Sequence, residues 1–83
     1  MESKWISVKE RLPEFVYDGD IYSTSRMIIV AKYTILGERE VSVGYYEKDT
    51  VRGKKVERWK DLHGRISTEV THWMPFPELP ENE

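Results

Sequence analysis

Cysteine is absent from this sequence of 83 residues. Its absence excludes disulfides and cysteine-ligated zinc, on which many small extracellular domains depend. The residues after Met1 contain no apolar run and therefore predict no signal peptide. The longest apolar run, residues 27–31, is far too short to cross a bilayer. These features favour a cytoplasmic protein with no membrane partner.

Motifs of catalysis are also missing. The sequence has no glycine-rich phosphate loop, no nucleophile elbow and no pair of histidines at metal-ligand spacing. Charges of both signs are mixed along the chain and sum to −2, so nucleic-acid binding is not favoured. We therefore predict no catalytic residues, no metal site and no cofactor.

Aromatic residues are the main core material of this chain, which has three Trp, five Tyr and two Phe. One buried Trp removes about 150–250 Å² from water, worth roughly 4–6 kcal/mol. That is comparable to the whole stability of a small domain. The length allows one domain, and we expect residues 1–83 to form it.

Four segments have the alternation and the β-branched or aromatic content of strands. We expect residues 14–26 between polar turn signals to form mostly a loop, and Gly37 to turn one hairpin. The fold class predicted is mainly β, a small twisted antiparallel meander of about four strands. The expected strands are residues 26–36, 38–48, 56–62 and 66–74.

Both ends of the domain have further signals. Ser7 to Glu10 fits a capping box, and Pro13 follows, so one short N-terminal helical turn is expected. The Pro-rich tail, residues 75–83, is expected to be extended. Gly44 inside a strand indicates a bulge or the close approach of something bulky, for which a Trp ring is the simplest candidate.

The two histidines and the paired acids favour structural interpretations. His63 precedes a glycine and is expected in an exposed turn. His72 lies in an apolar strand, which favours a hydrogen-bonded structural histidine over a catalytic base. Asp18 and Asp20 are typical of a solvated turn, with too few oxygen ligands for an EF-hand calcium loop.

Aromatic and cationic residues together give the candidate binding site. An exposed ring beside a cation makes a stacking surface for a base or a partner side chain. The alternative, which the small size of the domain favours, is that these rings fill the two faces of the sheet. The candidate residues are Tyr46, Arg58, Trp59, His72 and Trp73.

Four short motifs resemble the family known as domain of unknown function 551. They are Trp5-Ile6-Ser7-Val8, Arg11-Leu12-Pro13, Gly44-Tyr45-Tyr46 and Thr71-His72-Trp73-Met74-Pro75-Phe76-Pro77, and the resemblance extends to Pro80. The family consists largely of short proteins or modules encoded by bacteriophages and prophages. The resemblance implies an accessory protein of the bacterial cytoplasm and assigns no catalytic residue. Residues 14–26 are longer than the usual connection, and Phe76 stands where Leu is common.

The leading hypothesis is a non-enzymatic binding protein that binds a host protein or sequesters a small host molecule, and it includes self-association into a homo-oligomer. One alternative is a small hydrolase or nuclease-like enzyme that pairs His72 with Glu69 or Asp61. However, Glu69 and His72 are three residues apart and point to opposite faces of a strand. The other alternative is a structural or assembly component.

Overall fold

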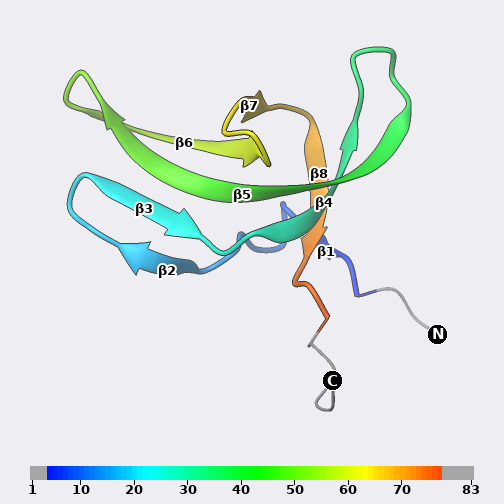
Figure 1. The fold of residues 1–83 in the computed structure, drawn as a ribbon, viewed down its shortest axis with the longest axis horizontal. Coiled ribbons are helices and arrows are strands. Elements are labelled where there is room, and N and C mark those ends of the chain that lie inside the picture. Colours follow the sequence, from blue (N-terminus) through cyan, green and yellow to red (C-terminus); the bar gives the residue numbers. More distant parts are fainter. Residues whose placement is uncertain (1–3, 78–83) are drawn as a thin grey trace.

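The computed structural model describes residues 4–77, which form eight β-strands and no helix (Figure 1). None of the described residues therefore forms a helix that could span a membrane. The strands are β1 (Ile6–Ser7), β2 (Phe15–Asp18), β3 (Tyr22–Ser25), β4 (Ile28–Tyr33), β5 (Arg39–Val51), β6 (Lys54–Asp61), β7 (Ile66–Ser67) and β8 (Val70–Met74).

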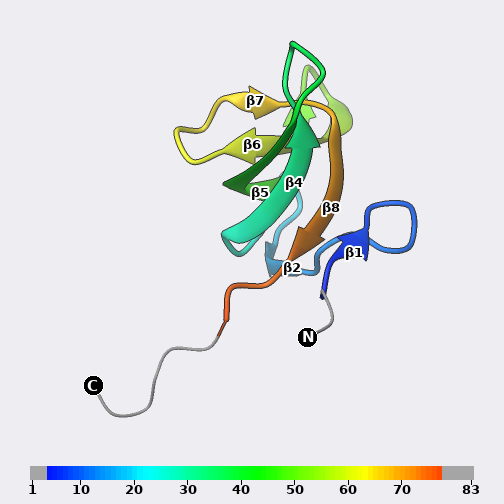
Figure 2. The ribbon, with the colours of Figure 1, turned by 90° about the vertical axis from the view of Figure 1, so that its right-hand side faces the viewer.

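All eight strands belong to one antiparallel sheet with the order β1-β8-β4-β5-β3-β2, and β6 pairs with β5 and with β7. The long β5 organises this sheet because its first half pairs with β4 and its second half pairs with β3. The sheet curls into a half-barrel, with β6 and β7 on one side and β4 and β8 on the other (Figure 2). Across the curl, Lys32 Nζ donates to Ser67 Oγ at 3.0 Å.

The inner face of the curl carries the hydrophobic core. Alternation along β4 turns Ile28 and Val30 inward, where they pack with Trp73. Trp59 covers this cluster from β6, and its ring lies 5.0 Å from that of Tyr46. The rings of Tyr46 and Phe15 are stacked at 5.9 Å. The aromatic residues thus fill the interior, as a chain this short requires.

The prediction of about four strands in a meander was wrong, although the antiparallel β class is confirmed. Residues 14–26 form the β2–β3 hairpin, in which Ser23 Oγ donates to Asp18 Oδ1 at 2.7 Å. Residues 49–55, which connect the two expected strands 38–48 and 56–62, are mostly strand, with a tight turn at Arg52 and Gly53. Residues 66–74 divide into β7 and β8 at Glu69, whose φ is 62°.

The predicted N-terminal helical turn is also wrong, because Val8 to Glu10 form only a hydrogen-bonded turn. Ser7 Oγ accepts from the backbone N–H of Lys9 at 3.1 Å, not from that of Glu10 as a capping box requires. Pro13, three residues after this turn, is buried. In the tail, residues 75–77 have no strand or helix, and the rest of the expected extended segment lies outside the described residues.

The backbone of the neighbouring strand, and not a Trp ring as expected, leaves no room for a side chain at Gly44. A Cβ at this position would lie 2.4 Å from the carbonyl oxygen of Lys60 on the neighbouring strand β6. We expect Gly44→Ala to lower the free energy of unfolding by about 1–3 kcal/mol, since the strands must separate to admit a methyl group. Urea denaturation measures this, with Ser42→Ala on the same strand as the control. Equal stability of the two variants would contradict the close approach.

Candidate functional site

One hollow lies on the outer face of the sheet, above Ala31. Ala31 pairs with Val41 on β5 and with His72 on β8, so these three side chains form a row across three strands. Its small methyl group between two larger neighbours leaves a depression of about 350 Å³. We call this depression the Ala31 hollow; Trp5, Ala31, Arg39, Glu40, Val41 and His72 line it.

The lining of the Ala31 hollow combines rings and charges over an apolar floor. The imidazole of His72 uses Nδ1 for a 2.9 Å hydrogen bond with Thr71 Oγ1 and makes no other hydrogen bond within the described part of the chain. The Arg39 guanidinium lies 5.0 Å from the centre of the Tyr33 ring and has no ion pair among the described residues. Thr71 Oγ1 donates its only proton to the Ala31 carbonyl oxygen, so His72 Nδ1–H donates to Thr71 and Nε2 of the neutral imidazole is an unused acceptor. The Arg39 guanidinium supplies the unused N–H donors among the residues that line the hollow.

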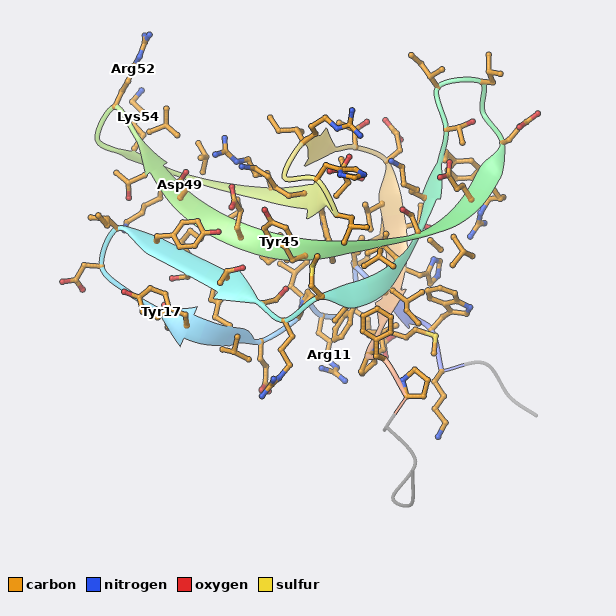
Figure 3. The ribbon with its side chains drawn as sticks, in the orientation of Figure 1. Arg11, Tyr17, Tyr45, Asp49, Arg52 and Lys54 are labelled. Carbon is orange, nitrogen blue, oxygen red and sulfur yellow. The ribbon has the colours of Figure 1, made fainter. Side chains whose placement is uncertain are left out.

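A buried ionic cluster lies further along the same face. Glu47 is only 1% exposed and accepts hydrogen bonds from Tyr22 Oη at 2.8 Å and from Arg58 Nε at 2.7 Å. Lys60 Nζ lies 3.4 Å from Glu47, and Arg58 also donates to Asp49 at 3.0 Å. Asp49 and Tyr45 project from this face of β5 in Figure 3. The cluster holds β3, β5 and β6 together by charge.

The pKa values of the cluster follow from these contacts. Burial alone would raise the pKa of Glu47, but the hydrogen bonds from Arg58 and Tyr22 and the charge of Lys60 together lower it. The hydrogen bond to Glu47 raises the pKa of Arg58. Burial, followed by the bond to Glu47, raises the pKa of Tyr22. Both oxygens of the carboxylate are thus already in use, and the cluster is structural.

The five candidate residues do not form one site. Tyr46, Trp59 and Trp73 lie on the inner face, where Tyr46 and Trp73 are buried. Arg58 lies on the outer face in the ionic cluster, and His72 lies in the Ala31 hollow. The rings of the first three belong to the core rather than to an exposed stacking surface, because register and not residue type decides which face each occupies.

The pairs considered for catalysis are also separated. His72 bonds to Thr71, and no hydrogen bond joins it to Glu69 or to Asp61 within residues 4–77. Asp61 instead accepts from the backbone N–H groups of His63 and Arg65, in the exposed turn where His63 lies. Residues 4–77 contain no group of three or more His, Asp or Glu side chains that could hold a metal ion, at Asp18 and Asp20 or elsewhere.

Sequence reasoning missed Ala31, Arg39, Trp5 and Glu47. Nothing in the sequence singles out Ala31, since its role depends on the neighbours that pairing gives it. Glu47 had one readable signal: it continues the alternating stripe of Val41, Val43 and Tyr45 at a position where an apolar residue is expected. An acid in such a stripe indicates a buried partner of opposite charge.

Fold and hollow together define a small, curled antiparallel β-domain with a mixed polar and aromatic depression on its outer face. A family model described as "Protein of unknown function (DUF551)" matches residues 4–81, and the chain belongs to this family. A search of curated proteins found no match, and a search of solved structures found none.

The fold explains why three of the four motifs that carry the resemblance lie near the two ends of the chain. The first motif contains β1 and the last contains most of β8, and these strands pair, with Ile6 opposite Trp73 and Ser7 opposite His72. Trp73 also donates from Nε1 to the carbonyl oxygen of Arg11 at 3.0 Å, which fixes the second motif to the last. The motifs therefore describe a closed contact between the ends of the domain.

Proposed function

We propose that this chain is a non-enzymatic binding protein that captures a small host molecule in the Ala31 hollow. The phage or prophage setting, and action in the bacterial cytoplasm, are part of the proposal and are supported by the family resemblance. Such a protein acts by occupancy and needs no catalytic group. A host protein is the other occupant that we consider, and the experiment below separates the two.

The hollow is the observation that carries the proposal. Its volume of about 350 Å³ falls within the range of small-ligand sites, about 300–1,000 Å³. The lining includes the rings of Trp5 and His72, the apolar side chains of Ala31 and Val41, and the opposite charges of Arg39 and Glu40. A planar molecule with one acidic or acceptor group fits this set, because stacking and a charged hydrogen bond act at different points of the ligand.

Filling the hollow gives a direct test. We expect the protein purified from bacterial cytoplasm to show, in native mass spectrometry, a discrete small adduct that is released on unfolding. Ala31→Leu places three more carbon atoms over the floor and should carry no adduct. Val43→Leu, on the same face and beside the hollow, is the control and should keep it. A bare wild-type protein, or an adduct that Ala31→Leu retains, would overturn small-molecule capture at this place.

The same spectra give the mass of the assembly and hence its number of chains. We propose that the protein forms a homo-oligomer. The turn between β4 and β5 exposes Ile35 fully and Leu36 to 80%, and contiguous apolar side chains at a hairpin tip favour contact with another surface. A single-chain mass at micromolar concentration would contradict self-association without bearing on the Ala31 hollow.

A further inference from the structure

A second hollow, of about 290 Å³, lies where the segment between β1 and β2 meets the end of β8. Two of its lining residues are arginines, so we call it the two-arginine hollow. Ile28 lies at its inner end, where it opens onto the core. The other lining residues are Arg11, Pro13, Glu14, Arg26, Trp73 and Pro75, and four of these belong to the motifs named in the sequence analysis.

The Arg11 guanidinium is positioned by Trp73. Its central carbon lies 5.3 Å from the centre of the indole ring, while the indole N–H holds the Arg11 carbonyl oxygen at 3.0 Å. The side chain of Arg11 is exposed and makes no ion pair within residues 4–77. A guanidinium that lies against an aromatic ring keeps its N–H edge available for a carboxylate.

Arg26 adds a second guanidinium to the same hollow. It directly follows β3 and lies two residues before Ile28, and its side chain is exposed with no ion pair in the described part of the chain. Its backbone is fixed, since Ser25 Oγ donates to the Arg26 carbonyl oxygen at 2.8 Å. Two such cations bind a carboxylate more strongly than one, because each contributes charged hydrogen bonds.

The remaining lining sets the size and charge of an occupant. Pro13 and Pro75 are rigid apolar walls without backbone N–H groups. Glu14 leaves a formal charge of +1 over the three charged residues of the hollow, which suits one carboxylate better than a doubly charged phosphate. The chain's net charge of −2 also disfavours a polyanionic backbone.

We propose that the two-arginine hollow docks an acidic segment of a partner protein. One Glu or Asp carboxylate of that segment bridges Arg11 and Arg26, and an adjacent apolar side chain packs between Pro13 and Pro75. This proposal is independent of the Ala31 hollow, which lies on the outer face and shares no lining residue with it.

A blocked peptide of sequence Pro-Glu-Leu-Pro-Glu is the probe, and its Gln counterpart is the matched neutral peptide. Binding to the full chain is followed by NMR at the indole N–H of Trp73. We expect the Gln peptide, and the variants Arg11→Gln and Arg26→Gln, to bind at least about tenfold more weakly, because each loses a charged hydrogen bond. Lys54→Gln, at the distant β5–β6 hairpin tip in Figure 3, should bind normally.

Three results would overturn the proposal. Equal binding of the acidic and Gln peptides would show that the carboxylate does not contribute to binding. Inorganic phosphate that binds as tightly as the peptide would identify a phosphate site instead. The probe also matches residues 77–81 of this chain. If replacing Glu78, Glu81 and Glu83 together by Gln tightened peptide binding, the chain's own acidic residues would be the occupant rather than a partner.

Discussion

Replacing Glu47 by alanine is expected to lower the free energy of unfolding by about 3–5 kcal/mol, as measured by urea denaturation. The carboxylate of Glu47 on β5 is buried between Tyr22 of β3 and two cations of β6, Arg58 and Lys60. Removing it leaves Lys60 and the Tyr22 hydroxyl without this acceptor and leaves Arg58 with Asp49. The whole free energy of unfolding of a small domain is about 5–15 kcal/mol, so this variant is expected to be partly unfolded at room temperature.

Glu47→Gln is the milder companion variant. It keeps the shape of the side chain and one acceptor oxygen but removes the charge, so we expect a smaller loss than for alanine. Glu38→Gln, in the exposed turn before β5, controls for loss of a negative charge and should be neutral within about 0.5 kcal/mol. If Glu47→Ala were as stable as Glu38→Gln, the ionic cluster would contribute nothing to the fold.

The loss of stability at acid pH gives a second measurement on the wild type and Glu47→Gln. The folded-state pKa of Glu47 is lowered, so its contribution is complete above the unfolded value of about 4.3 and is lost as pH falls through the lower folded pKa. Backbone hydrogen bonds from Arg65 and His63 lower the pKa of Asp61 and act in the same direction. We expect the free energy of unfolding of Glu47→Gln to fall less steeply as the pH is lowered, because the contribution of Asp61 remains and that of Glu47 is gone.

Trp73→Ala is expected to lower the free energy of unfolding by about 3–5 kcal/mol. Trp73 is 4% exposed, packs on Ile28 and Val30, and belongs to β8, the strand that pairs with β1. Its removal leaves a cavity in a core with few other large side chains. Thermal unfolding followed by far-ultraviolet circular dichroism measures the loss.

Two controls separate packing from hydrogen bonding at this position. Trp73→Phe keeps an apolar ring but removes the N–H that donates to the Arg11 carbonyl oxygen, so about 0.5–1.5 kcal/mol of its cost comes from this lost hydrogen bond. Phe76→Ala removes an exposed aromatic ring from the same segment and should change stability little. A Trp73→Ala variant as stable as Phe76→Ala would exclude Trp73 from the core.

The strands that the sequence predicts best are β4 and β5. Ile28 to Ala31 is a short continuous apolar run rich in β-branched residues, and Val41, Val43 and Tyr45 recur at a period of two. The β2–β3 hairpin was missed because Ser23, Thr24 and Ser25 are polar, yet two of them are buried. Their hydroxyls satisfy backbone and side-chain partners inside the sheet, a condition that only tertiary contacts reveal.

The candidate site was less accessible to sequence reasoning than the fold. Aromatic residues were the obvious choice by type, but a face cannot be assigned before the register is known, and Tyr46 and Trp73 face inward. His72 was identified because an imidazole in an apolar strand is unusual. The hollow beside it depends on a small residue, Ala31, that is opposite His72 only after β4 and β8 have paired.

The pairing of β1 with β8 sets the order in which the domain is completed during synthesis. Ile6 and Trp73 are separated by nearly the whole chain, and long-range pairs of this kind slow folding because a large loop must close before they form. The β4–β5 and β5–β6 hairpins can form on the ribosome, but the core stays open on one side until β8 has emerged. Chains that stop before Trp73 therefore present an uncovered apolar sheet to the cell's proteases.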